Sequence, residues 1–230
     1  MKITPIASGS SGNAILVSDG NTKILLDAGI TYRSLSRRVD LSEVEATLIS
    51  HHHGDHVKAV PELLRRGHEV YASRGEWECI GEDSLSEWNS NIVSHKEPVS
   101  IGSFRIMPFN VNHDTPEPLG YYGVSTETNK RFVYIVDSAI INFGFKGVTH
   151  WLLEANHYRE GLENSTLDDI VKQRIANNHM SFENLKTFLA TSDMKSTEQI
   201  HLLHLSNGNS NEKLFQQELQ QQYGVPVYCH

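Results

Sequence analysis

The sequence has little cysteine and no long apolar run. Its two cysteines, Cys79 and Cys229, lie far apart, which excludes a disulfide scaffold and a cysteine-based zinc site. No apolar stretch approaches the roughly 18–20 residues that span a bilayer. The N-terminal segment turns polar at Ser8 and lacks the apolar core of a signal peptide. We therefore expect a cytoplasmic protein with no membrane partner.

Positive charge is also scarce. The 230 residues include 20 Lys and Arg against 28 Asp and Glu, a formal net charge of -8. This balance argues against nucleic-acid binding by bulk electrostatics, but it does not exclude an enzyme whose cations are bound metal ions. Hydrophobic residues make up 38% of the chain, enough to exclude disorder. The length predicts one α/β domain over residues 1–230.

Histidine, in contrast, is abundant. Four of the 13 histidines lie between positions 51 and 56, in a His-x-His-x-Asp-His pattern that follows an expected strand over 46–50. His51 and His53 are two residues apart, so on an extended chain they point the same way. Asp55 and His56 come at the start of an expected helix over 57–66. One metal ion can take the first pair and a second ion the other; the alternative is a solvent-facing loop rich in histidine.

Three further side chains stand where apolar runs end. His113, Asp137 and His204 each follow an expected strand. Any one of them alone is more often a turn former or a helix cap. Together, beside the histidine cluster, they indicate a dinuclear site in which a carboxylate can bridge two ions. A mixed imidazole and carboxylate set suits Zn, Mn or Fe. The seven expected ligands are His51, His53, Asp55, His56, His113, Asp137 and His204.

The order of expected elements indicates the fold class. The first half is rich in strands, and the second half alternates strands with helices over 166–176 and 181–189. Ser165 or Thr166, together with Asp169, is a plausible start for the first of these helices. The pattern predicts two packed β-sheets with helices outside, in an α/β protein.

These motifs resemble those of the metallo-β-lactamase-fold hydrolases. Asp27, within Leu25-Leu26-Asp27-Ala28-Gly29, resembles the first motif, and the seven expected ligands match the second to fifth motifs. The resemblance runs from Ile3 to His204 and beyond. It implies a four-layer αββα sandwich with two packed mixed sheets, and a metal site at one edge of the sheets.

Four other segments are similar to the YycJ/WalJ group, whose members are described as metal-dependent 5′-to-3′ DNA exonucleases. The same group is similar to ribonuclease Z and to phosphodiesterases of phosphonate breakdown. Glu154 and His179 match the Glu and His that cooperate as proton donor in ribonuclease Z. Tyr158 departs from the Asp that the group usually has there. The segments are 8–13, 153–157, 178–181 and 204–209.

The expected roles follow from phosphodiester chemistry, which needs an activated water, neutralised phosphate charge and a proton for the leaving oxygen. Asp55 orients the water or accepts its proton, and His179 backed by Glu154 protonates the leaving group. The glycine-rich turn either cradles a phosphate or is only a tight hairpin. The substrate-binding residues that we expect are Ser8, Ser10, Ser11, Asn13 and Ser206.

The sequence thus predicts a hydrolase with two divalent ions, Zn²⁺ or Mn²⁺, that cleaves phosphodiester bonds with metal-activated water. A 5′-to-3′ DNA exonuclease is the leading hypothesis, with DNA as the partner. The alternative is a phosphodiesterase for small molecules or cyclic nucleotides. Hydrolysis of a lactone, thioester or β-lactam, or a non-catalytic metal-binding module, ranks below these. The prediction also allows for a homodimer.

Overall fold

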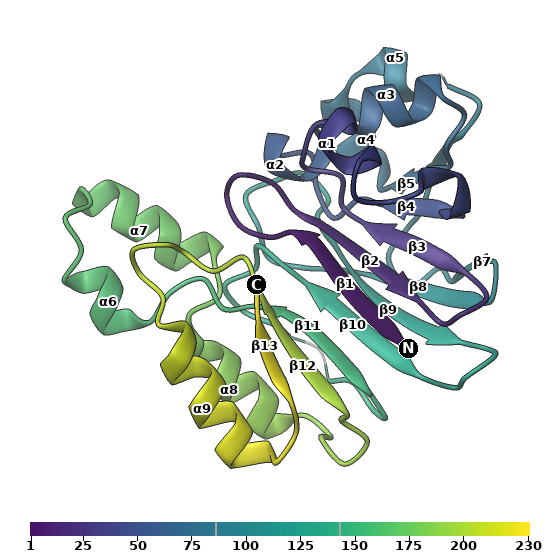
Figure 1. Ribbon diagram of the computed structural model, residues 1–230. Helices are drawn as coiled ribbons and strands as arrows, with labels where there is room; N and C mark the ends of the chain where they lie inside the picture. The colour runs from purple at the N-terminus through teal and green to yellow at the C-terminus, as the bar shows by residue number, and fades with distance from the viewer. Residues whose placement is uncertain (86, 143) are drawn as a thin grey trace. The chain divides into compact units, whose positions relative to one another are not determined.

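The computed structural model describes residues 1–85, 87–142 and 144–230 (Figure 1). These residues form two compact units. Unit 1 comprises Met1–Asn110 and Thr115–Lys130, and unit 2 comprises Val111–Asp114 and Arg131–His230. The single domain over residues 1–230 stays a prediction. Among the residues that the structure describes, no helix is long and apolar enough to cross a membrane.

Unit 1 contains a mixed six-stranded sheet whose strands follow one another in sequence order, from β1 to β6. The first three strands pair antiparallel, and those from β3 onward pair parallel. Leu25 and Leu48 lie on neighbouring strands and are fully buried, so burial of apolar surface stabilises the centre of this sheet. The strands are β1 (Lys2–Ala7), β2 (Ala14–Ser18), β3 (Lys23–Leu26), β4 (Ala46–Leu48), β5 (Val70–Ala72) and β6 (Ser90–Ile92).

An antiparallel group of three strands, in the order β9-β8-β7, completes the β-structure of unit 1. The Tyr121 hydroxyl on β9 donates to the carbonyl of Ile49, which follows β4, at 2.5 Å. The Asp19 carboxylate accepts from the hydroxyls of Ser103 and Ser125, each at 2.6 Å. These bonds join the group to the six-stranded sheet. Its strands are β7 (Val99–Ile101), β8 (Phe104–Asn110) and β9 (Leu119–Ser125).

The helices of unit 1 are short. The helix predicted over 57–66 is confirmed from Val60 to Arg65 as α3, but its predicted start is wrong, because Val57 ends a separate helix, α2. Pro61 explains the break. It has no backbone N–H and so cannot donate the hydrogen bond that would continue α2, whereas the first turn of a new helix needs no such bond. The helices are α1 (Tyr32–Ser36), α2 (Gly54–Val57), α3 (Val60–Arg65), α4 (Arg74–Ile80) and α5 (Glu82–Leu85), with the 3-10 turn η1 (Leu41–Glu43).

The strands of unit 2 are all parallel, in the order β13-β12-β11-β10. Helices α8 and α9 lie beside each other against these strands, as Figure 1 shows. The ring of Phe182 on α8 stacks on that of Phe215 on α9 with centroids 4.1 Å apart, and Phe188 meets Trp151 of β11 edge-on at 5.7 Å. The strands are β10 (Arg131–Ile135), β11 (His150–Glu154), β12 (Gln199–Leu203) and β13 (Val227–Cys229).

The helices of unit 2 correct one predicted boundary. The helix expected over 166–176 begins at Asp169, because the Asp168 carboxylate accepts from the backbone N–H of Ile170 at 2.8 Å and caps it there. The helix expected over 181–189 is confirmed, with Ser181 as its cap. The helices are α6 (Arg159–Glu163), α7 (Asp169–Asn178), α8 (Phe182–Thr191) and α9 (Glu212–Tyr223).

Three strands are followed by a left-handed residue. Asp27 after β3, Asp137 after β10 and His204 after β12 have φ values of 59°, 50° and 53°. Non-glycine residues seldom adopt this region, and Asp, Asn and His do so more readily than others. Such strained positions cluster at functional sites. The backbone at these strand ends thus points to the residues that carry chemistry.

Candidate metal centre

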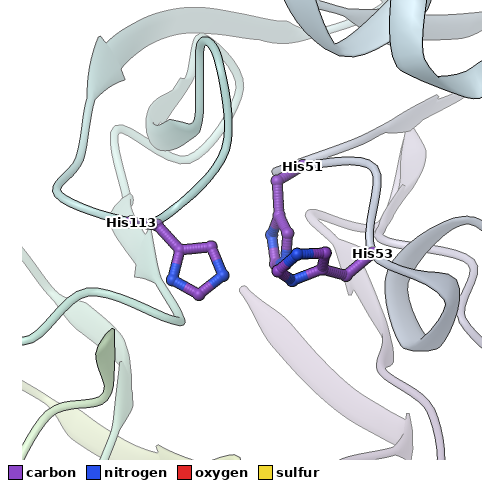
Figure 2. A group of neighbouring side chains, drawn as sticks. All are labelled: His51, His53 and His113. Carbon is purple, nitrogen blue, oxygen red and sulfur yellow. The ribbon is translucent and has the colours of Figure 1, made fainter. Parts of the chain in front are cut away.

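In unit 1, the histidine cluster follows β4 and leads into α2. The rings of His51 and His56 have centroids 4.0 Å apart, and those of His51 and His53 lie 4.8 Å apart. Figure 2 shows the side chains of His51 and His53 extending from this loop with their rings side by side. Asp55 and His56 lie in α2, at the helix start that the sequence predicts. The loop therefore brings the imidazole rings of His51, His53 and His56 close together, as a metal site requires.

A buried carboxylate orients these imidazoles. Oδ2 of Asp27 lies 2.8 Å from Nδ1 of His56, and both side chains are fully buried. The Ser50 hydroxyl donates to Asp27 at 2.9 Å and lies 3.0 Å from Nδ1 of His51. Histidines that bind metal ions usually engage a carboxylate or a similar group through the other ring nitrogen. The donor set of unit 1 fits a divalent ion on this criterion.

Backbone hydrogen bonds hold the glycine-rich turn against α2. Asn13 donates to the Asp55 carbonyl and Ala28 to the His56 carbonyl, each at 2.8 Å. Gly29 donates to the Asn13 carbonyl, and a Cβ on Gly29 would lie 1.5 Å from the Asp55 oxygen. The Asn13 side chain is itself buried and lies 3.1 Å from Nε2 of His56. Asn13 is thus in a position to hold His56.

The three serines of that turn, Ser8, Ser10 and Ser11, are expected from the sequence to bind the substrate. Ser10 and Ser11 are exposed, Ser8 is half-buried, and the N–H of Gly9 donates to the Asn13 side chain at 2.9 Å. No described contact tests whether they bind phosphate, so that role stays a prediction.

His52 is held by a different carboxylate from its neighbours. Its Nδ1 lies 2.6 Å from the fully buried Glu76 carboxylate, which also accepts from the His52 backbone N–H at 2.7 Å. The other oxygen of Glu76 accepts from the N–H of Glu117 at 2.9 Å. Glu76 therefore fixes the middle of the loop, so that His51 and His53 are held on either side of an anchored residue.

In unit 2, four titratable side chains converge. Asp137, Glu154, His179 and His204 each offer a ligand atom, and these atoms lie within 4.8 Å of one another. Oε1 of Glu154 lies 2.7 Å from Nδ1 of His179 and 3.1 Å from Nδ1 of His204. Its other oxygen accepts from the N–H groups of Met180 and Ser138. A fully buried carboxylate with this many partners organises the cluster.

The charges of this cluster depend on one another. Burial disfavours the charged form of His179, but the Glu154 carboxylate and hydrogen bonds to Asp137 and Glu154 outweigh it and raise the His179 pKa to about 11. Burial likewise opposes ionisation of Glu154, yet His179 prevails and lowers the Glu154 pKa. The structure therefore pairs an imidazolium with a carboxylate at the end of β11.

The loops around this cluster are tied together. The N–H of Asn112 donates to the Ser138 hydroxyl at 3.1 Å, which links the His113 loop to the Asp137 loop. The rings of His113 and His179 have centroids 6.2 Å apart. Figure 2 draws the His113 side chain with its ring at the end of that loop.

The segment after β12 is held in the same way. The amide of Asn156 donates to the His204 carbonyl at 3.0 Å, and the N–H of Ser206 donates to the Asn156 carbonyl at 2.9 Å. The Ser206 hydroxyl accepts from Asn209 at 3.3 Å, so its expected role in substrate binding stays a prediction. Tyr158, which departs from the family pattern, packs its ring edge-on against Phe215.

Sequence reasoning assigned no role to Ser50, Glu76 and Asn156. Ser50 directly precedes the histidine motif and Asn156 lies in segment 153–157, and a polar residue beside a candidate ligand is a usable signal. Glu76 lies on α4, and nothing in its local sequence marks it as the partner of His52. Only the folded chain brings it there.

A family model described as the beta-lactamase superfamily domain matches residues 22–204. The match covers most of the chain, and the chain belongs to this superfamily. The expectation that it is an enzyme of the hydrolase class is thereby confirmed. Candidate His and Asp clusters within a metallo-β-lactamase fold indicate that it binds divalent metal.

Within this superfamily, the chain is similar to two exodeoxyribonucleases. The chain is 28% identical over 229 residues to the exodeoxyribonuclease WalJ of Streptococcus pneumoniae, a match that covers 93% of this chain and 84% of the relative. It is 26% identical over 230 residues to the exodeoxyribonuclease YycJ of Bacillus anthracis, with 94% and 86% covered. The expected resemblance to the YycJ/WalJ group is confirmed.

A solved structure supports the fold. The metallo-β-lactamase fold protein YhfI from Bacillus subtilis matches with a TM-score of 0.74 at 17% identity, covering 99% of this chain and 95% of that one. The predicted fold class, an α/β metallo-β-lactamase fold with two packed mixed sheets and helices, is confirmed.

Proposed function

We propose that this protein is a metal-dependent phosphodiesterase that degrades DNA from an end, in the 5′-to-3′ direction. The observation that carries the proposal is the pairing of the fully buried Glu154 with the half-buried His179, whose Nδ1 lies 2.7 Å from Oε1 of Glu154. A leaving alkoxide needs a proton, and an imidazolium held by a carboxylate can donate one. The names of the WalJ and YycJ relatives support DNA as the substrate.

We further propose that two divalent ions, Zn²⁺ or Mn²⁺, are bound. The donor chemistry of both units and the Asp27 brace on His56 support this assignment. When bound, such ions supply charge neutralisation for the phosphate and acidify water. The ligands would be His51, His53, Asp55, His56, His113, Asp137 and His204.

The chain's own residues then have distinct tasks. Because Nδ1 of His179 engages Glu154, Nε2 is the nitrogen left to deliver a proton to the leaving oxygen. Glu154 fixes this tautomer and ring orientation. Asp55 lies on α2 with its side chain 26% exposed, so it can orient water or accept its proton. Ser8, Ser10, Ser11 and Ser206 would contact the substrate, whereas Asn13, expected among them from the sequence, is buried and would act by holding His56.

The test compares DNA forms. Protein reconstituted with Mn²⁺ or with Zn²⁺ is incubated with linear DNA labelled at either end, with closed circular DNA and with cyclic nucleotides. We expect linear DNA to be degraded from its 5′ end and circular DNA to stay intact. Activity should be lost with a chelator and in the His51→Ala variant.

Two other outcomes would contradict the proposed DNA exonuclease activity. Opened cyclic nucleotides with intact DNA would favour the small-molecule phosphodiesterase, for which a net charge of -8 is no obstacle. Metal content without turnover of any phosphodiester would overturn catalysis altogether. Sizing the same sample against standards tests the homodimer.

A further inference from the structure

Unit 2 contains a cavity of about 390 Å³ among α6, α7 and α8 that no step above uses. Its size lies within the range of small-ligand sites. Leu162 and Ala176 are its apolar lining residues. The remaining lining residues are His157, Arg159, Glu163, Lys172, Gln173, Ser181 and Asn184.

The first pointer to a ligand is His157. Its side chain is 2% exposed, and its Nδ1 has no hydrogen-bond partner among the described residues. An unsatisfied buried polar atom costs free energy, so such atoms in folded proteins usually have an explanation. Burial also lowers the His157 pKa, against the opposing effect of the Glu154 charge. Because His157 lines the cavity, a polar atom of a bound group within reach of the ring would satisfy it.

The second pointer is an excess of donors. Lys172 gives one bond to the Glu163 carbonyl at 2.9 Å, which leaves two of its three N–H groups. Arg159 gives one side-chain bond to Asn184 at 3.2 Å, which leaves most of its five. Among the described lining residues, Glu163 is the one carboxylate, and Glu183 receives the Arg159 backbone N–H nearby. Two cations and one carboxylate among the described lining residues leave an excess of positive charge, which favours an anionic ligand.

The third pointer is position. His157 and Ser181 form a parallel bridge, and the N–H of Phe182 donates to the His157 carbonyl at 2.7 Å. Glu154 precedes His157 by three residues, and His179 precedes Ser181 by two. The amide of Asn184 donates to the Ala139 carbonyl at 3.0 Å, in the loop that carries Asp137. The cavity wall therefore continues the segments that hold the proposed proton donor.

We propose that this cavity binds the phosphomonoester of a single nucleotide, with Arg159 and Lys172 on the phosphate and His157 on the sugar or base. This inference rests on the proposed function. A cavity that holds one nucleotide next to His179 accounts for cleavage at a strand end, because the terminal nucleotide fills it. The ligand can come from two sources: the phosphorylated end of a strand, or a mononucleotide released by cleavage.

Kinetics on strands test the first source. Single strands carrying a 5′-phosphate, a 3′-phosphate or two hydroxyl ends are compared in the metal-loaded protein. We expect the 5′-phosphate, at the end where the proposed degradation begins, to lower KM by about tenfold. The Arg159→Gln and Lys172→Gln variants should remove that preference. Their turnover of bis(p-nitrophenyl) phosphate, which has no phosphomonoester, should stay unchanged. Lys195→Gln, an exposed lysine elsewhere in unit 2, is the matched control.

Calorimetry tests the second source without any turnover. Titrations use deoxyadenosine 5′-monophosphate, deoxyadenosine and inorganic phosphate, each with the wild type and the two variants. Photo-cross-linking with 8-azido-adenosine monophosphate, followed by peptide mapping, locates the site. Weaker nucleotide binding in both variants, with cross-links in α6 or α7, supports the cavity as a nucleotide site.

The outcomes separate the two proposals. Equal affinities and equal end preferences in wild type and variants, or cross-links only outside α6–α8, overturn the cavity site. Absence of turnover on DNA and on bis(p-nitrophenyl) phosphate by the wild type overturns the proposed function. Because the calorimetric titrations need no turnover, they still test nucleotide binding to the cavity in that event.

Discussion

Nδ1 of His56 lies 2.8 Å from Oδ2 of Asp27, and both side chains are fully buried. Asp27 also accepts from the N–H of Ser50 at 2.7 Å and from its hydroxyl at 2.9 Å. One carboxylate thus organises the strand end of β4 and the imidazole on α2. The link between Asp27 and the proposed metal ligands is therefore direct, and substitution of this one carboxylate measures it.

Asp27→Asn should weaken metal binding by about 10–100-fold, the usual cost of losing such a partner. Asparagine keeps the size of the side chain and tolerates the left-handed backbone at this position, where φ is 59°. Affinity is measured by competition with a coloured chelator. The exposed Asp193→Asn variant is the control. Unchanged affinity in Asp27→Asn would contradict the role of the carboxylate.

Gly29→Ala should destabilise unit 1 by about 3 kcal/mol or more, since overpacking without room to relax is costly. The added Cβ would lie 1.5 Å from the Asp55 carbonyl oxygen, so the segment after β3 that carries Gly29 must move away from α2. Gly54→Ala is a matched control, because a Cβ there meets nothing within 4 Å. Urea unfolding curves compare the two variants. Equal free energies of unfolding for the two variants would show that Gly29 does not pack against the Asp55 carbonyl of α2.

Glu154→Gln should lower kcat on DNA by about 10²–10⁴, the typical contribution of a positioned acid. The loss should be much smaller for a substrate whose leaving group is p-nitrophenolate, which needs no proton. Because Glu154 also contacts His204, the comparison is made at saturating metal, with bound metal measured by plasma mass spectrometry, and Glu160→Gln on the exposed side of α6 serves as control. Equal losses on both substrates would contradict the role of the Glu154–His179 pair as acid.

Asp19 should make the protein sensitive to acid. Partial burial raises the pKa of its carboxyl, but hydrogen bonds from Ser103, Ser125 and the turn outweigh burial and lower it to about 2. Since the folded-state pKa lies below the unfolded value, this stabilisation is present above about pH 4 and is lost as pH falls towards 2. Asp19→Asn should cost about 1 kcal/mol at pH 7, a modest figure because the side chain is partly exposed.

The measurement is the free energy of unfolding from pH 7 to pH 2, in urea, for wild type and Asp19→Asn. The two curves should converge as pH falls, because both proteins then lack the charge. Asp193→Asn should run parallel to wild type throughout. A constant gap between wild type and Asp19→Asn would show that the charge contributes nothing.

The sequence predicts most of this fold because its signals are local. Apolar strands, the cap at Ser181 and the histidine motif after β4 are each readable within a few residues. The helix predicted over 57–66 begins only at Val60 for an equally local reason, since Pro61 cannot donate the hydrogen bond that would continue α2. Helix α7 has no buried residue, so no apolar periodicity marks where it begins.

The contacts that orient the site are harder to predict. Glu76 reaches His52 from α4, and Asn156 reaches His204 from the end of β11. Each pair is far apart in sequence and meets only when the strands and helices have packed. A sequence shows which residues can bind a metal or carry a proton, whereas the residues that hold them in place depend on tertiary structure.

The left-handed backbone at Asp27, Asp137 and His204 has a consequence for how this protein can evolve. Two requirements act on these positions at once: the local conformation penalises branched and bulky residues, and the proposed metal site needs a carboxylate or an imidazole. Asparagine and glycine tolerate the left-handed conformation, but they supply neither a carboxylate nor an imidazole. A descendant that abandoned catalysis while keeping its shape should therefore drift to asparagine or glycine at these strand ends, and such replacements would mark lost activity in distant homologues.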